Sequence, residues 1–263
     1  MAKNDFFIKM SFTGSDVHRI TLGCVSNQGA RSYQEDSFGF SSIEQKDVDR
    51  YGFTAIVADG MGGIEGGAQV SSYVVSSMLD MQKSRDPGVP VHLHLSRSLC
   101  SVNDSILRSG MSGGSTAVVL MCLPMGVHWC TVGDSRVYLF RDNCLTVMNE
   151  DSDYMNKLIE QVISGEMTFE EAGEDVKKDS LTQYMGHKGG ITPDVNPKPL
   201  VPRHRDKLML CSDGVYNALT EGELLEALSR PAEAAAAAIE DMVVTKGYST
   251  QDNFTAVVLE FAR

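Results

Sequence analysis

Residues 115–148, STAVVLMCLPMGVHWCTVGDSRVYLFRDNCLTVM, constrain the fold of this chain more than any other segment. The segment is rich in β-branched and other apolar residues, and only the short turns Pro-Met-Gly, Gly-Asp-Ser and Arg-Asp-Asn interrupt it. Turns of this length cannot hold the helical crossover that joins two parallel strands. The segment therefore predicts three or four strands that form an antiparallel meander.

Further strand-like runs lie toward the two ends of the chain, and most of the helical segments lie between them. The strand-like runs are 19–26, 36–43, 51–58, 207–212 and 253–261, and the helical segments are about 65–84, 92–109, 153–163, 220–229 and 231–246. Residues 150–190 are polar and acidic, which predicts a surface flap subdomain. This distribution predicts an α+β fold, and we expect residues 1–263 to form one domain.

The charge balance and the cysteines limit the partners and the compartment. The chain has 23 Lys and Arg against 35 Asp and Glu, a formal charge of −12, whereas binding to nucleic acid or to an anionic membrane requires clustered cations. No apolar stretch approaches the ~18 residues of a membrane span, and charges interrupt the first residues, MAKNDFFIKMSF. The six cysteines form no Cys-x-x-Cys pair. We therefore expect a cytoplasmic protein with reduced thiols that binds neither nucleic acid nor membrane.

The glycine-rich stretch DGMGGIEGG, 59–67, resembles a dinucleotide-binding fingerprint but fits one poorly. Such a loop must bring backbone N–H groups to a pyrophosphate, and Asp59 at its start would repel that group. Asp80, about 20 residues further on, ends a helical segment, whereas a ribose-binding acid would end a second strand. We do not expect a dinucleotide site here.

A second phosphate-related pattern is the Cys-x5-Arg spacing of Cys130 and Arg136 in CTVGDSR. A cysteine-dependent phosphatase needs a thiolate in a positive cradle of backbone N–H groups. Here Asp134 lies within the loop, and Cys130 continues the alternation of a strand with Val132. A core cysteine is the better interpretation.

Six acidic residues stand at tight turns or at the ends of strand-like runs: Glu35, Asp36, Asp59, Asp134, Asp213 and Asp252. Each one alone is compatible with a structural turn, because Asp-Gly and Asp-Asn are common turn formers. If the strand ends converge, however, two carboxylates ~4 Å apart repel by about 4 kcal/mol at an effective dielectric of ~20. Such a cluster needs bound cations, and carboxylate oxygens suit Mg²⁺ or Mn²⁺.

Two neighbours of these acids complete the chemistry of a phosphate-ester hydrolase. Gly60 has no side chain, so its carbonyl can reach an ion, and Arg31 is the natural cation for a phosphate oxygen. Carboxylates that hold two ions beside an arginine predict a two-metal hydrolase that acts on phosphate esters.

Seven motifs of the chain occur in the order of a known family: RSYQED, VADGMGG, GSTAVV, VGDSRVY, LTQYMG, CSDGV and DNFTAVV. By these motifs, which span nearly the whole chain from Gly23 to Leu259, it resembles the metal-dependent serine/threonine protein phosphatases of type 2C. The compact length and the Asp-Gly-Met-Gly-Gly sequence are similar to the bacterial branch. The resemblance implies a central β-sandwich of two antiparallel sheets flanked by α-helices, with a flap subdomain and a metal cleft at one end.

The resemblance also implies the ligands of two Mn²⁺ or Mg²⁺ ions. Asp59 is expected to bridge both ions, and the carbonyl of Gly60 to contact one of them. Asp36, Asp213 and Asp252 are expected to complete the shell.

Three further residues have implied roles around those ions. Glu35 is expected to act mostly through water, Arg31 to bind the substrate phosphate, and Asp134 to share a third, weaker ion with Asp213. The implied reaction is direct attack on phosphoserine or phosphothreonine by a water or hydroxide that bridges the two metals. Implied partners are phosphoproteins, the substrates of a cognate Ser/Thr kinase, and we expect a monomer.

Two questions stay open from the sequence. Met61 stands where many eukaryotic members have a histidine proposed as general acid, and His187 is a possible substitute that is more simply a surface histidine. The alternative function is that of a catalytically silent, phosphatase-like regulatory binding module.

Overall fold

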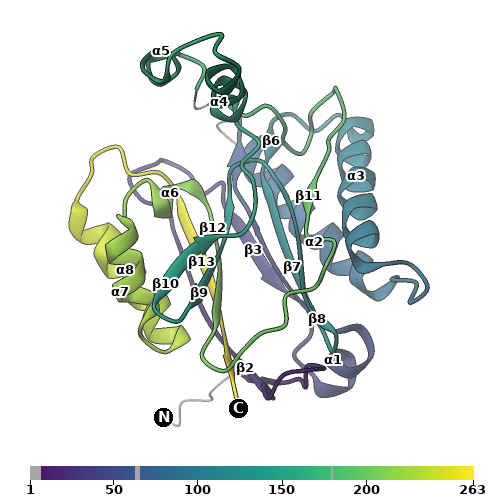
Figure 1. Ribbon diagram of the computed structural model, residues 1–263. Helices are drawn as coiled ribbons and strands as arrows, with labels where there is room; N and C mark the ends of the chain where they lie inside the picture. The colour runs from purple at the N-terminus through teal and green to yellow at the C-terminus, as the bar shows by residue number, and fades with distance from the viewer. Residues whose placement is uncertain (1–6, 63–65, 179) are drawn as a thin grey trace.

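Two antiparallel sheets packed face to face form the centre of the protein, which was analysed as a computed structural model (Figure 1). The structure describes residues 7–62, 66–178 and 180–263. The first sheet has the order β1-β2-β13-β12-β9-β10 and the second has the order β11-β8-β7-β4-β3. The predicted α+β sandwich is confirmed.

The strands of the first sheet come from both ends of the chain and from its middle. They are β1 (Phe7–Lys9), β2 (Arg19–Asn27), β9 (Arg136–Arg141), β10 (Cys144–Val147), β12 (Lys207–Cys211) and β13 (Phe254–Ala262). The C-terminal strand β13 lies between β2 and β12 and pairs with both along its length. The two ends of the chain are thereby joined in the middle of one sheet.

The second sheet contains β3 (Ser37–Phe40), β4 (Phe53–Ala58), β7 (Ala117–Leu123), β8 (Gly126–Val132) and β11 (Asp194–Val195). A separate two-stranded ladder pairs β5 (Gly60–Met61) with β6 (Gly114–Ser115). All six residues of β4 and all seven of β7 and of β8 are buried, because this sheet is covered on both faces.

The predicted meander over residues 115–148 is wrong at one point. β7 and β8 form a hairpin in the second sheet, and β9 and β10 form a hairpin in the first. The chain therefore crosses from one sheet to the other between Val132 and Arg136, and Asp134 lies at this crossing. The turn is as short as predicted, but a short turn does not determine whether the next strand joins the same sheet.

Helices cover the outer face of each sheet, as the helical segments predicted (Figure 1). Residues of α7 (Glu221–Leu228) and α8 (Ala232–Lys246) pack with the first sheet in one apolar cluster. Residues of α2 (Gly66–Lys83) and α3 (Val91–Ser109) pack with the second sheet in another. A third cluster fills the space between the sheets and includes Phe53, Trp129 and Leu210. These three apolar layers fix the strand ends in place.

Several short elements were not predicted. They are β1, β5, β6, β11, the helix α1 (Gln45–Tyr51), the short helix α5 (Phe169–Glu174) and the one-turn helix α6 (Asp213–Tyr216). The predicted strand 36–43 extends only over Ser37–Phe40. Among the described residues, no helix has both the length and the apolar character needed to cross a membrane.

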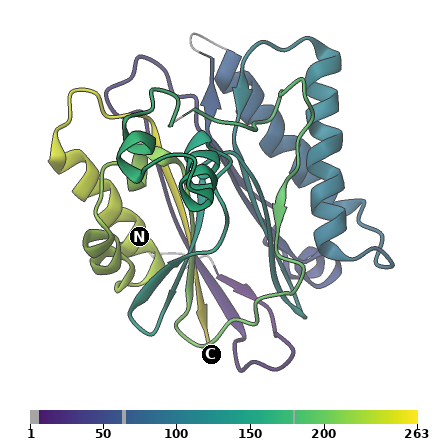
Figure 2. The same ribbon diagram turned by 45° about the horizontal axis from the view of Figure 1, so that its top comes forward.

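The acidic segment at 150–190 projects from one end of the sandwich (Figure 1), and it lies in front of the sheets when that end is turned toward the viewer (Figure 2). It contains α4 (Tyr154–Ser164) and α5 (Phe169–Glu174). Asp153 caps α4 by accepting a hydrogen bond from the backbone of Asn156, and Thr168 and Glu171 form a capping box at the start of α5. The base of the segment is closed by an isolated bridge between Asp153 and Leu181.

Candidate active site

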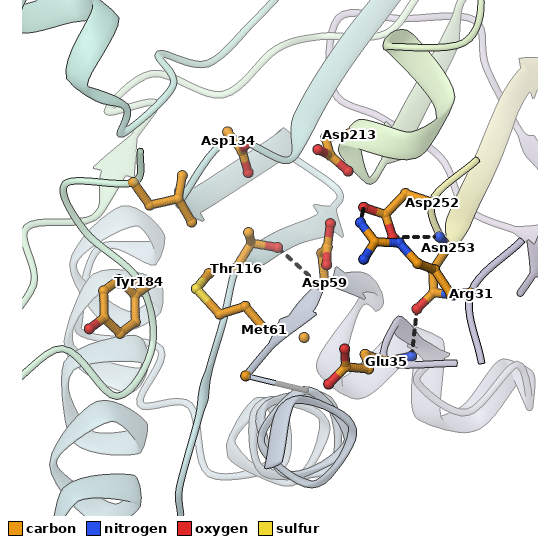
Figure 3. Close-up of a pocket in the computed structure, with 13 residues that line it drawn as sticks. Arg31, Glu35, Asp59, Met61, Thr116, Asp134, Tyr184, Asp213, Asp252 and Asn253 are labelled. Atoms are coloured by element: carbon orange, nitrogen blue, oxygen red, sulfur yellow. Dashed lines mark hydrogen bonds and ion pairs between the residues drawn. The ribbon is translucent and has the colours of Figure 1, made fainter. Parts of the chain in front are cut away.

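A cleft of about 540 Å³ opens at the end of the sandwich where the predicted acidic residues lie (Figure 3). Seven of the eight predicted site residues line it: Arg31, Glu35, Asp59, Gly60, Asp134, Asp213 and Asp252. Further lining residues that the sequence did not single out as part of a site are Gly62, Thr116, Leu181, Tyr184 and Asn253, with Met61 beside them. The structure thus gathers the predicted acids in one place.

The acids converge because antiparallel strands alternate in direction. Asp59 follows β4 and Asp213 follows β12, whereas Asp252 stands just before β13. Strands that end and strands that begin therefore meet at the same edge. Asp134 reaches the edge from the crossing between the two sheets. The positions of these carboxylates are consequently set by the sandwich and not by flexible loops.

Asp36, the eighth predicted residue, lies behind the cleft wall. It is 6% exposed and does not line the cleft. The hydroxyl of Ser212 donates a hydrogen bond to its Oδ2 at 2.8 Å, whereas its Oδ1 is buried without any hydrogen-bond partner. Glu35 Oε1 is likewise buried and unpartnered. An unpaired buried carboxylate oxygen is costly, so both atoms point to a missing donor or cation.

Burial raises the pKa of four of these carboxyl groups, and their mutual repulsion raises it further. The pKa of Asp36 rises to about 6 through desolvation and then through the charges of Asp213 and Asp252. Desolvation also raises the pKa of Asp134 to about 7 and that of Asp59 well above its ordinary range. The pKa of Asp213 is raised by burial and by Asp252. Without cations, the cluster retains protons that isolated aspartates would lose.

The donor set fits Mn²⁺ or Mg²⁺ in its chemistry. Every donor is a hard oxygen, from carboxylates or from the Gly60 carbonyl, and these cations prefer such ligands. In the described part of the chain, however, no three His, Cys, Asp or Glu side chains are grouped tightly enough to surround one ion. The carboxylates line the cleft as an open set, as expected for like charges that repel one another. The unpaired oxygens of Asp36 and Glu35 nevertheless favour a cation site.

Backbone crowding explains why residue 60 is a glycine. The N–H of Gly60 donates to the carbonyl of Glu35 at 3.2 Å, and a Cβ at this position would collide with the carbonyl oxygens of Gly67 and Glu35. The loop can pass through this gap only without a side chain. The glycine therefore keeps Asp59 and Glu35 in the same wall of the cleft.

Arg31 lies at the mouth of the cleft and forms an ion pair with Asp252. Its Nη2 is 2.6 Å from Asp252 Oδ2, and the two side chains are 58% and 40% exposed. An exposed pair of this kind contributes about 0 to 1 kcal/mol to stability, so it can exchange for another anion. The geometry places an exposed guanidinium, held by an exchangeable ion pair, next to the acidic cluster.

Buried hydroxyl groups orient two of the acids. The backbone N–H of Asp59 donates to Thr116 Oγ1 at 2.9 Å, and the N–H of Thr116 donates to the carbonyl of Asp59 at 2.8 Å. The hydroxyls of Thr116 and Ser135 lie 2.7 Å apart, which links the Asp59 turn to the turn that carries Asp134. Ser135 thus joins two acidic turns, and Ser212 holds a third acid through its hydrogen bond to Asp36.

The two other phosphate-related patterns do not form sites. Cys130 is fully buried and desolvation raises the pKa of its thiol well above the ordinary range, while Arg136 is held by Asp151 at 2.7 Å. No thiolate therefore faces an arginine. Asp80 lies within α2, as the helical segment predicted, and cannot end a second strand.

The described part of the cleft offers no histidine for the role of general acid. Met61 lines the cleft, whereas His187 does not and instead packs edge-on against Tyr184, with its Nδ1 2.9 Å from the Gly190 carbonyl. The described lining residues include no histidine.

Two named relatives match most of the sequence. The serine/threonine phosphatase stp of Listeria welshimeri is 30% identical over 241 residues, which cover 88% of this chain and 91% of that protein. A putative protein phosphatase of 2C type from Streptococcus pyogenes is 27% identical over 187 residues, covering 66% of this chain and 71% of that protein. No protein-family model matches the sequence.

Solved structures share the fold. The S. agalactiae serine/threonine phosphatase superimposes with a TM-score of 0.77 at 22% identity. The match covers 93% of this chain and 100% of that one. The catalytic domain of the phosphatase PstP, in complex with two manganese ions, has a TM-score of 0.69 at 23% identity and covers 93% of this chain and 99% of its own.

The raised pKa values predict that the metal-free protein loses stability as the pH rises. Between about pH 4 and pH 7 the folded state keeps protons on Asp36 and Asp134 that the unfolded state has released, so unfolding becomes more favourable with increasing pH. Thermal unfolding after EDTA treatment should show a Tm several degrees higher at pH 5 than at pH 7.5. Mn²⁺ should stabilise the protein more at pH 7.5, where it displaces fewer protons.

The matched control is Asp134→Asn, which removes one of the titrating groups and should flatten the pH dependence of Tm in the metal-free protein. A Tm that stays constant or rises from pH 5 to pH 7.5 would contradict the assigned pKa directions.

Proposed function

The chain belongs to the bacterial branch of the type 2C serine/threonine protein phosphatases, and from this membership we propose how its cleft hydrolyses phosphoserine and phosphothreonine. The observation that carries the proposal is the convergence of five acidic side chains and Arg31 in one cleft. Phosphoryl transfer needs a positioned nucleophile and compensation of negative charge, and a carboxylate cluster can provide both only by holding cations.

We assign the metal ligands from the motifs that the chain shares with its family. Asp59 would hold two Mn²⁺ or Mg²⁺ ions between the sheets, with the Gly60 carbonyl on one of them. Asp36, Asp213 and Asp252 would complete the shell, and Asp134 would share a third, weaker ion with Asp213. When bound, the two core ions supply positive charge for the phosphate oxygens and lower the pKa of the attacking water.

Glu35 would orient water beside the ions, and Arg31 would bind the substrate phosphate. Glu35 lines the cleft, so its carboxylate can accept a hydrogen bond from a water there and orient it. Arg31 exchanges its exposed ion pair with Asp252 for the substrate phosphate, because its planar guanidinium can donate two parallel hydrogen bonds to phosphate oxygens. We propose direct attack by water, because the described lining residues include no thiol and no histidine, and the carboxylates that line the cleft would be occupied in holding cations.

The leaving serine or threonine oxygen must receive a proton. Met61 cannot donate one, and the described lining residues offer carboxyl groups and Tyr184 but no imidazole. We propose that a water in the cleft supplies this proton. The hydrophobic side chains of Met61 and Leu181 would limit the number of waters there.

The proposal also covers the substrates, the compartment and the oligomeric state of the protein. Phosphoproteins modified by a cognate Ser/Thr kinase would be the substrates, and the protein would act as a cytoplasmic monomer. All six cysteines are free, which is consistent with a reducing compartment. The net charge of −12 disfavours nucleic acid and anionic membranes as partners.

The first experiment is turnover of a small aryl phosphate. We expect hydrolysis that requires Mn²⁺ or Mg²⁺, stops in EDTA and survives thiol alkylation, because the thiol of Cys130 is buried and protonated. Hydrolysis that survives EDTA but is lost on alkylation would contradict the metal mechanism. Metal binding with no turnover of the aryl phosphate or of phosphopeptides would favour the silent binding module.

Asp59→Asn tests the central ligand. The amide keeps the shape of the side chain but removes its charge, so turnover should fall by at least about 10²-fold and the affinity for Mn²⁺, measured by titration calorimetry, should fall as well. Circular dichroism should show an unchanged fold. Asp80→Asn on the exposed surface of α2 is the matched control and should leave both quantities unchanged. Full turnover by the Asp59 variant would exclude the assignment.

A further inference from the structure

Arg31 stands on a segment that has no regular secondary structure of its own. Residues 28–36 lie between the end of β2 and the start of β3, and Arg31 is exposed there. A phosphate-binding guanidinium on such a segment must be positioned by contacts from elsewhere, because misplacement by about 1 Å can cost roughly 100-fold in rate.

One side chain makes three of those contacts. The Oδ1 of Asn253 accepts a hydrogen bond from the backbone N–H of Glu35 at 2.8 Å. Its Nδ2 donates to the carbonyl of Gln28 at 2.7 Å and to the carbonyl of Tyr33 at 2.9 Å. Asn253 therefore binds the segment before Arg31 and after it, and it uses both amide hydrogens to do so.

Asn253 is itself rigid. Its residue is 5% exposed, it directly precedes the central strand β13, and its N–H is bonded to Asp252 Oδ1 at 2.8 Å. Figure 3 shows Arg31, Asp252 and Asn253 together on one side of the cleft. The side chain therefore holds the segment that carries Arg31 in a fixed position relative to the sheet.

Two nearby contacts hold the same segment against residues 251–252. The N–H of Ala30 donates to the carbonyl of Gln251 at 2.9 Å. Gly29 has a φ of +60°, and a Cβ there would collide with the carbonyl oxygen of Asp252. On the other side, the exposed Gln28 side chain donates to the carbonyl of Arg31 at 2.6 Å.

We propose that Asn253 is a positioning residue for substrate phosphate: it acts through Arg31 by clamping residues 28–35 to the start of β13. The amide is specific for this task, because only Asn at this length offers one acceptor and two donors. Its three bonds leave it no donor for the phosphate itself. The proposal rests on the proposed phosphatase function, in which Arg31 binds that phosphate.

The test variant is Asn253→Leu, which keeps the shape and adds no charge beside Asp252. The matched control is Asn196→Leu. Asn196 is also buried, at 8%, and also bonds three backbone groups: its Oδ1 accepts from Trp129 N–H, and its Nδ2 donates to the carbonyls of Val127 and Lys198. It does not line the cleft. A loss of activity that comes only from a weakened fold should therefore be equal in the two variants.

With an aryl phosphate and saturating Mn²⁺, Asn253→Leu should lower kcat/KM by about 10- to 100-fold, mainly through KM, and should weaken inhibition by inorganic phosphate by the same factor. Asn196→Leu should leave KM unchanged. In an Arg31→Ala background, Asn253→Leu should change kcat/KM less than about twofold, because its route to the substrate is already removed. An unchanged KM, or a full additive effect in that background, would overturn the proposal.

Of two further measurements, the first changes only an exposed side chain and so leaves the buried fold intact, and the second needs no turnover. The exposed variant Gln28→Ala removes only the bond to the Arg31 carbonyl and should raise KM about two- to fivefold. Trypsin should cut after Arg31 at least about tenfold faster in Asn253→Leu than in the native protein or in Asn196→Leu. Equal cutting rates would overturn the clamp. If the native protein hydrolyses no phosphate ester, the proposed function fails, and the trypsin comparison still decides whether the clamp exists.

Discussion

Repulsion among the buried carboxylates at one end of the sandwich opposes folding, and the packing of the two sheets must overcome it. Burial and mutual charge raise the pKa values of Asp59, Asp134 and Asp213, so the metal-free cluster opposes its own assembly. The acids are nevertheless held close because they stand at the ends of strands that belong to two fully packed sheets. The apolar layers between and outside those sheets supply the stability that the acidic end removes.

The chain order explains how two sheets can share one site. The crossing between β8 and β9 places Asp134 over the gap, while Thr116 and Ser135 join the turns on its two sides by hydroxyl contacts. The sequence predicted the strands and the turn at this point but wrongly predicted one meander. Sheet membership depends on distant partners, since β9 pairs with β12 and β7 pairs with β4, and no local pattern encodes those pairings.

Contacts between distant residues also decide which site residues could be predicted from the sequence and which could not. Acids at strand ends beside glycines are conspicuous in a sequence, and motif order identified the family. Thr116 and Asn253 stand inside the motifs GSTAVV and DNFTAVV, but the sequence assigned them no role, because that role depends on bonds to the backbone of Asp59 and of Gln28, which lie 57 and 225 positions away. Their importance is a property of the contacts, which exist only after the two ends of the chain have met at β13.

The opposite wall of the cleft differs from the acidic wall because it is largely apolar. Met61, Leu181 and Tyr184 bring apolar surface to it, and Leu181 and Tyr184 come from the segment that returns from α4 and α5. That segment is fixed at its base, where Asp153 bridges Leu181 and the Thr182 hydroxyl donates to the Ser152 carbonyl at 3.0 Å, while the two helices project away from the sandwich (Figure 1). The projecting helices can therefore vary in sequence without moving the carboxylates. Chemistry is set by the sandwich, and selection among phosphoproteins can be set by the flap.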